Sequence, residues 1–220
     1  QLSIPKSRFM LQVTHIIDLL IHIDAHNYLI RKRLLHFGQI LAIISQIIHA
    51  LQAEYDTTTH SNRGSIIQVN TGEGKTIIAS LLAAALTLLG HTVDVVSSSP
   101  WLAARDARES KEFFESLGLI CHDNADHVTG YSNGVKTCYQ QDDQKRHPIV
   151  YGDLGSFQFD WLRHHYHHQR TMCAAPMKCD NCDVSNTTKL YNKASCQYTR
   201  PQDMIIVDEA DNGLIDHCND

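Results

Sequence analysis

Apolar residues in the first fifty positions of the chain recur at a spacing of three or four. The two clearest sets are Ile16, Leu19, Leu20 and Ile23, then Ile40, Ile43, Ile44 and Ile47. This spacing places apolar side chains on one face of a helix. The pattern predicts two or three amphipathic helices within residues 7–51, followed by a polar loop over residues 54–64.

Beyond residue 64 the pattern changes to short, continuous apolar runs that alternate with helical segments. The runs predict strands at residues 65–69, 92–96, 119–121, 149–151 and 204–207. Helices are predicted at residues 75–89, 100–117 and 156–168, and loops at 122–147 and 171–201. Continuously apolar strands are typical of a parallel sheet covered on both faces. We therefore predict an N-terminal helical segment over residues 1–60 and an α/β lobe over residues 61–220.

The composition narrows the class of protein. The 220 residues include 19 Lys and Arg against 24 Asp and Glu, a formal charge of −5. A surface that wraps nucleic acid usually has a basic excess, so nucleic acid is a poor candidate partner. The odd count of seven cysteines disfavours a disulfide scaffold, and every long apolar run is interrupted by polar residues. We expect a cytoplasmic protein without a transmembrane span, and we expect this chain to be a segment of a longer one.

A glycine-rich segment stands between the first predicted strand and the next helix: Thr71, Gly72, Glu73, Gly74, Lys75 and Thr76. Two glycines let the backbone curl so that successive N–H groups surround phosphate oxygens, and the following helix adds its positive end. Lys75 would contact the β- and γ-phosphates, and the Thr76 hydroxyl would ligate Mg²⁺. The segment predicts a site for a nucleoside triphosphate.

An acidic tetrad ends the last predicted strand: Asp208, Glu209, Ala210 and Asp211. Ligands of parallel α/β sheets bind outside the carboxyl ends of the strands, where this strand and the one before the glycine segment both end. Asp208 would hold Mg²⁺, and Glu209 would orient or deprotonate the water that attacks the γ-phosphate. Taken together, the two motifs predict a site that binds ATP with Mg²⁺.

Four ordered blocks resemble the SecA preprotein translocase family. They are the segment TGEGKT at 71–76, WLAARDA at 101–107, YG at 151–152 with FQFDWLR at 157–163, and VDEAD at 207–211 with LID at 214–216. The resemblance implies a RecA-like P-loop lobe with a mostly parallel sheet, the first of two such lobes in that motor. It also implies that Gln39 hydrogen-bonds the adenine edge.

The same resemblance implies a motor that couples ATP hydrolysis to the movement of an unfolded polypeptide, with a membrane translocation partner and peripheral membrane association. The family's second lobe supplies an arginine to the site, and such an arginine can raise the rate by roughly 10³–10⁵. We expect these 220 residues to bind ATP but to hydrolyse it slowly by themselves.

Two alternatives stay open. A superfamily 2 nucleic-acid helicase shares the phosphate segment and the Asp-Glu-Ala-Asp tetrad, although its charge and the segment at residues 101–107 would be unusual. A nucleotide-gated interaction module would bind ATP without consuming it.

Two further sets of residues could ligate metals. The first is Cys173, Cys179, Cys182 and Cys196, which contains one Cys-x-x-Cys pair, whereas structural zinc sites normally present two. The second is His164, His165, His167 and His168. We interpret the cysteines as loop thiols and the histidines as a solvated helix surface.

Overall fold

The computed structural model describes residues 6–55, 64–124, 131–132, 135–142, 146–166, 171–174 and 200–210. The chain forms two compact units, residues 1–89 and residues 90–220, and each is described by itself. The predicted boundary near residue 60 stays a prediction.

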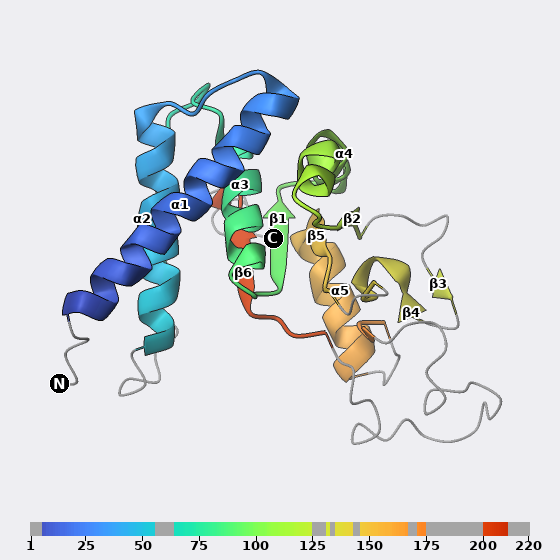
Figure 1. The fold of residues 1–220 in the computed structure, drawn as a ribbon. Helices are drawn as coiled ribbons and strands as arrows, with labels where there is room; N and C mark the ends of the chain where they lie inside the picture. The colour runs from blue at the N-terminus through green and yellow to red at the C-terminus, as the bar shows by residue number, and fades with distance from the viewer. Residues whose placement is uncertain are drawn as a thin grey trace. The chain divides into compact units, whose positions relative to one another are not determined.

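The described residues of the first unit form three helices, two in the N-terminal segment where the apolar spacing predicted helices and one at the helix predicted over residues 75–89. They are α1 (Lys6–Arg31), α2 (Phe37–Tyr55) and α3 (Lys75–Leu88), and α3 contacts both of the others. In Figure 1, α1 runs up to the short connection and α2 runs back down from it. The core side chains recur at helical spacing, Ile16, Leu20 and Ile23 on α1 with Ile43 and Ile47 on α2. Every residue of α3 from Ile78 to Leu86 is buried, so this Ala- and Leu-rich helix is the centre of the unit.

The strand predicted at residues 65–69 is wrong. Residues 64–70 have no regular secondary structure, and none of the described strands pairs with them. Ile66 is 89% exposed, so the apolar run is not buried. An isolated extended segment has no partner for its backbone N–H and C=O groups, and a short apolar run cannot supply one locally.

The second unit contains a four-stranded sheet. Its strands are β1 (Val93–Ser97), β2 (Cys121–Asp123), β5 (Ile149–Asp153) and β6 (Met204–Val207). The order is β2-β5-β1-β6 and every pair is parallel. A separate antiparallel pair joins β3 (Tyr131–Ser132) to β4 (Val135–Lys136). The α/β class with a parallel sheet is therefore confirmed.

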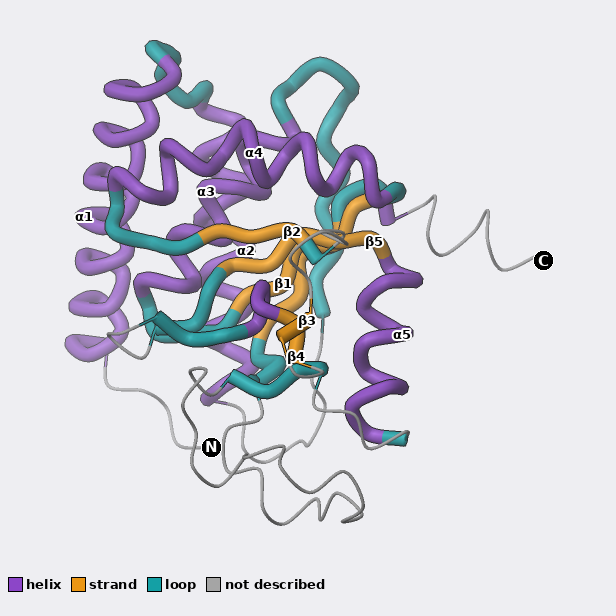
Figure 2. The backbone as a smooth tube through the Cα atoms, turned by 90° about the vertical axis from the view of Figure 1, so that its right-hand side faces the viewer, coloured by secondary structure: helices purple, strands orange, loops and turns teal. Residues whose placement is uncertain are grey.

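Helices α4 (Pro100–Ser116) and α5 (Leu154–His165) cover opposite faces of this sheet. The connection through α4 leads from β1 towards β2, whereas the connection through α5 leads from β5 in the opposite direction to β6. Because parallel crossovers are right-handed, opposite directions place the two helices on opposite faces. Figure 2 shows α4 above the strands and α5 on their other side.

Two adjacent residues of β5, Val150 and Tyr151, point to opposite faces of the sheet. The Tyr151 ring lies 6.3 Å from the Phe114 ring of α4, measured between centroids. Val150 packs instead with Cys138, Tyr139 and Met172 on the other face, where Phe157 of α5 joins them. Successive side chains of β5 thus enter two separate hydrophobic layers.

The polar stretch at residues 122–147 is more structured than predicted. It carries the β3–β4 pair and a 3₁₀ turn, η1 (Thr137–Tyr139), and the side chains of Lys136 and Tyr139 are buried. The sequence pattern missed this because the partners of these side chains come from distant segments. None of the described helices is long and apolar enough to cross a membrane.

Candidate functional site

The glycine segment forms the turn that precedes α3. Gly72 and Gly74 both have positive φ angles, +88° and +78°, which side chains with a Cβ rarely adopt. The N–H of Glu73 donates to the carbonyl of Asn70 at 3.3 Å and closes the turn. Lys75, the first residue of α3, is exposed. The two glycines therefore permit a turn that residues with a Cβ would rarely form.

The start of α3 is open to an anion. Gly74 is the N-cap residue and brings no side-chain acceptor, and its carbonyl accepts from the N–H groups of Ile77 and Ile78 at 3.0 and 3.1 Å. The first N–H groups of any helix, here those of Lys75 and Thr76, have no intrahelical partner. They lie at the positive end of the helix dipole, where an anionic oxygen is stabilised.

Gln39 contacts the glycine loop directly. Its side-chain Nε2 donates to the Glu73 carbonyl at 2.7 Å, and its Oε1 accepts from the His36 N–H at 2.9 Å. Gln39 is the third residue of α2, so the second contact is the helix-capping bond that a Gln at this position makes. A Cβ on Gly74 would lie 2.7 Å from Nε2, which is a clash. The structure therefore places Gln39 at the phosphate loop, while its contact with adenine stays a prediction.

The acidic residues Asp208 and Glu209 lie at the carboxyl end of β6. The Asp208 N–H donates to the Val96 carbonyl at 2.9 Å and so continues the ladder with β1. The Glu209 backbone has a φ of +56°, in the left-handed region, and its Oε2 accepts from the Ser98 hydroxyl at 2.8 Å. Both acids follow β6, and both are hydrogen-bonded to the end of the neighbouring strand β1, so they lie at the carboxyl edge of the sheet.

The segment at residues 101–107 lies at the same edge, in the first turns of α4. The Ser99 side chain caps this helix by accepting from the Leu102 N–H at 3.2 Å. Arg105 donates to Asp106 through Nε and Nη2 at 2.9 and 2.7 Å, and this bond raises the pKa of the Arg105 guanidinium. Burial raises the pKa of Asp106, with Arg105 opposing that effect. Asp208 acts electrostatically on Arg105, so the helix start and the acids share one charged environment.

The third strand at this edge contributes the block at residues 151–153. Asp153 pairs in register with Ser97 and caps α5 by accepting from the Ser156 N–H at 3.2 Å. A Cβ on Gly152 would clash with the Asn124 side chain, so this position favours glycine. The Tyr-Gly block is therefore explained by close packing.

Sequence reasoning missed two buried ion pairs in the second unit. Lys136 donates to Asp160 at 2.7 Å, and the Tyr139 hydroxyl donates to the same carboxylate oxygen at 2.7 Å. Arg200 lies 2.7 Å from Asp94 and also donates to two backbone carbonyls, those of Val93 and Pro148. No local pattern could have revealed these pairs, because each joins residues that are far apart in the chain.

The candidate metal ligands are placed only in part. Among the described residues, no group of three or more His, Cys, Asp or Glu side chains could hold a metal ion. Cys179, Cys182 and Cys196 lie outside the described residues, as do His167 and His168. Of the four candidate cysteines, the structure describes Cys173, which is buried. Cys138, which is not one of the four, is also buried, and its burial raises the pKa of its thiol to about 12.

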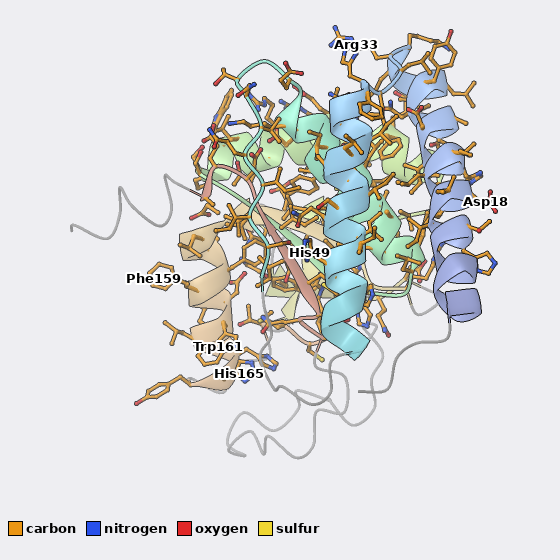
Figure 3. All side chains as sticks on the ribbon, turned by 90° about the vertical axis from the view of Figure 1, so that its left-hand side faces the viewer. Asp18, Arg33, His49, Phe159, Trp161 and His165 are labelled. Atoms are coloured by element: carbon orange, nitrogen blue, oxygen red, sulfur yellow. The ribbon has the colours of Figure 1, made fainter. Side chains whose placement is uncertain are left out.

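The interpretation of the histidines as a solvated surface is wrong for His164. This side chain is buried, and its Nδ1 accepts from the Met172 N–H at 3.2 Å. His165 packs on Trp161 instead, with ring centroids 4.7 Å apart. Figure 3 shows Phe159, Trp161 and His165 along α5. The helix turns one histidine inward and the next outward, a difference that a cluster in sequence cannot reveal.

The four-stranded parallel sheet with helices on both faces defines the α/β class. The model of the SecA DEAD-like domain matches residues 33–219, and the chain belongs to this family. A protein translocase subunit SecA from Helicobacter pylori strain Shi470 is 32% identical over 159 residues, 70% of this chain and 15% of the relative.

Two other relatives carry the same name. The SecA of Helicobacter acinonychis is 31% identical over 159 residues, and that of Aliarcobacter butzleri is 32% identical over 157 residues. The matched region covers 14–15% of the length of these relatives. No solved structure matches the chain.

Proposed function

We propose that this chain is the ATP-binding lobe of a SecA-type protein translocase motor. The observation that carries the proposal is the glycine loop, in which two positive φ angles and an uncapped helix start occur together. Family membership supports the same conclusion, because the matching domain includes the loop and the acidic edge.

Each residue of the proposed site has a role that suits its chemistry. The loop N–H groups and Lys75 bind the phosphates, and Thr76 and Asp208 supply oxygen ligands for Mg²⁺. Such a donor set suits Mg²⁺, which proteins commonly hold through one or two side chains together with phosphates and water. When bound, Mg²⁺ neutralises the charge of the phosphates. Glu209 orients the attacking water and accepts its proton.

The substrate and partners follow from the relatives, which are named protein translocase subunits. We propose that the motor moves an unfolded polypeptide, that a membrane translocation partner receives it, and that a second motor lobe completes the site. Because an arginine from that lobe can contribute roughly 10³–10⁵ in rate, we expect these residues alone to hydrolyse ATP slowly.

Binding of fluorescent ATP to the wild type and to Lys75→Ala tests the site. We expect the variant to lose at least about tenfold in affinity, because it lacks a charge-assisted contact worth roughly 1.5–3 kcal/mol. Lys111→Ala is the control, since Lys111 is also exposed and makes only a long contact of 3.9 Å with Glu115. Equal binding by wild type and both variants would contradict the proposal.

The nature of the cargo needs a second measurement, on the full-length protein. A translocase motor is stimulated by unfolded polypeptide, whereas a helicase is stimulated by RNA. The net charge of −5 favours the first result. Stimulation by RNA alone would establish the helicase, and ATP binding without any hydrolysis would establish the nucleotide-gated module.

A further inference from the structure

Ser98 lies directly after β1 and contacts the acid that the proposed mechanism uses. Its hydroxyl donates to Oε2 of Glu209 at 2.8 Å, across 111 positions of sequence. Both residues belong to the second unit, and Glu209 is exposed. A hydroxyl that donates to an exposed carboxylate fixes one of its two oxygens and leaves the other to accept from water.

The backbone at Glu209 adds a second observation. Its φ of +56° is unfavourable for a residue with a Cβ, and such strain persists only where the surroundings hold it. One restraint is the bond from the Asp208 N–H to the Val96 carbonyl. The other is the contact with Ser98, which acts on the side chain. The main chain next to Glu209 and the Glu209 side chain are therefore both hydrogen-bonded to the end of β1.

We propose that Ser98 is a positioning residue that holds the Glu209 carboxylate in the orientation needed to align the attacking water. The inference rests on the proposed function, because it assigns Ser98 a role only through Glu209. In this assignment Ser98 acts on the reaction through the Glu209 side chain. Its removal should lower the rate of hydrolysis and leave ATP binding intact.

The test compares steady-state ATP hydrolysis by the full-length wild type, Ser98→Ala and Ser98→Thr. We expect kcat to fall about tenfold in Ser98→Ala with KM for ATP unchanged, which is smaller than the roughly 10²–10⁴-fold contribution of a general base. Ser98→Thr keeps the hydroxyl and should restore most of the rate. Ser116→Ala is the control, because that hydroxyl also makes a short hydrogen bond, 2.7 Å to the Phe113 carbonyl, at the other end of α4.

A double-mutant cycle separates positioning from a purely structural role. In the Glu209→Gln background, Ser98→Ala should cost no further rate, because its target has lost its basicity. Amide hydrogen exchange gives a readout without activity, since Ser98→Ala should speed exchange at residues 208–210 and Ser116→Ala should not.

Three results would overturn the inference. They are an unchanged kcat in Ser98→Ala, a loss of equal size in the Glu209→Gln background, and a wild type that binds ATP but does not hydrolyse it. None of these contradicts ATP binding itself. Failure of the wild type to bind ATP would instead overturn the proposed function.

Discussion

At the glycine loop, Lys75 is exposed and Gly72 and Gly74 hold positive φ angles, whereas beneath α5 the charges of Lys136 and Asp160 are buried and lie 2.7 Å apart. At the loop, both glycines adopt φ angles that residues with a Cβ rarely take, and the following helix starts without a side-chain cap. At the buried pair, Lys136 and the Tyr139 hydroxyl both donate to the same carboxylate oxygen of Asp160.

Comparing the loop with the buried pair indicates how charged residues that bind ligands can be told from charged residues that hold the fold together. Lys136 and Asp160 carry the same kinds of charge as Lys75 and Asp208, so residue type alone does not distinguish them. What distinguishes them is burial: Lys136 and Asp160 are buried, whereas Lys75 is exposed and Asp208 is half-buried. A charge paired in the interior stabilises one packing arrangement, while an exposed charge beside an open helix start can bind a ligand.

The largest expected effect is on the buried pair. Lys136→Met removes the closest cation from the Asp160 carboxylate and leaves only the longer contact with Arg163, and breaking a buried pair costs about 3–5 kcal/mol of unfolding free energy. Urea unfolding monitored by circular dichroism measures the change. Lys111→Met is the matched control, because its exposed pair is worth under about 1 kcal/mol. Similar losses in the two variants would show that the interior pair does not stabilise the fold.

A smaller loss of stability, with a clear loss of binding, is expected at the loop. Gly74→Ala must hold a φ of +78°, which costs about 1–2 kcal/mol, and its Cβ would displace Gln39. ATP affinity should fall at least about tenfold, because the loop N–H groups lose their alignment.

The control for this variant is Gly38→Ala, where a new Cβ meets no atom within 4 Å. Isothermal titration with ATP and urea unfolding on both proteins give the two quantities. Binding by Gly74→Ala at wild-type strength would remove the loop from the site.

The smallest effect concerns His147, which is neither exposed nor ionically paired. Burial lowers the pKa of His147 from its ordinary value of 6.5, and the nearby Arg200 lowers it further. Below pH 6.5 the unfolded chain therefore takes up a proton more readily than the folded chain. Wild-type stability should fall as the pH drops through this range.

His147→Gln removes this contribution, so its stability should depend less on pH between 7 and 5 than that of the wild type. Urea midpoints at several pH values measure the difference between the two proteins. Parallel pH dependences would mean that His147 does not titrate differently in the folded and unfolded states.

Local sequence predicted most helices and strands well, but it did not predict which of them pack or pair together. The helices at α1 to α5 and the strands β1, β5 and β6 were predicted near their observed positions, because apolar spacing and helix-ending residues act locally. The strand at residues 65–69 failed because a strand needs a neighbour. Gln39 was placed at adenine by resemblance, and its capping bond and its contact with Glu73 emerged only in the structure.

Residues that are neighbours in the chain were enough to predict the α/β class, the family resemblance and the glycine loop, because apolar spacing, motifs and helix starts are local features. The pairing of buried charges, the inward orientation of His164 and the contact of Ser98 with Glu209 became evident only in the folded protein. Those contacts join residues that are distant in the chain, and the sheet order that brings them together is fixed by packing and hydrogen bonding across the whole unit.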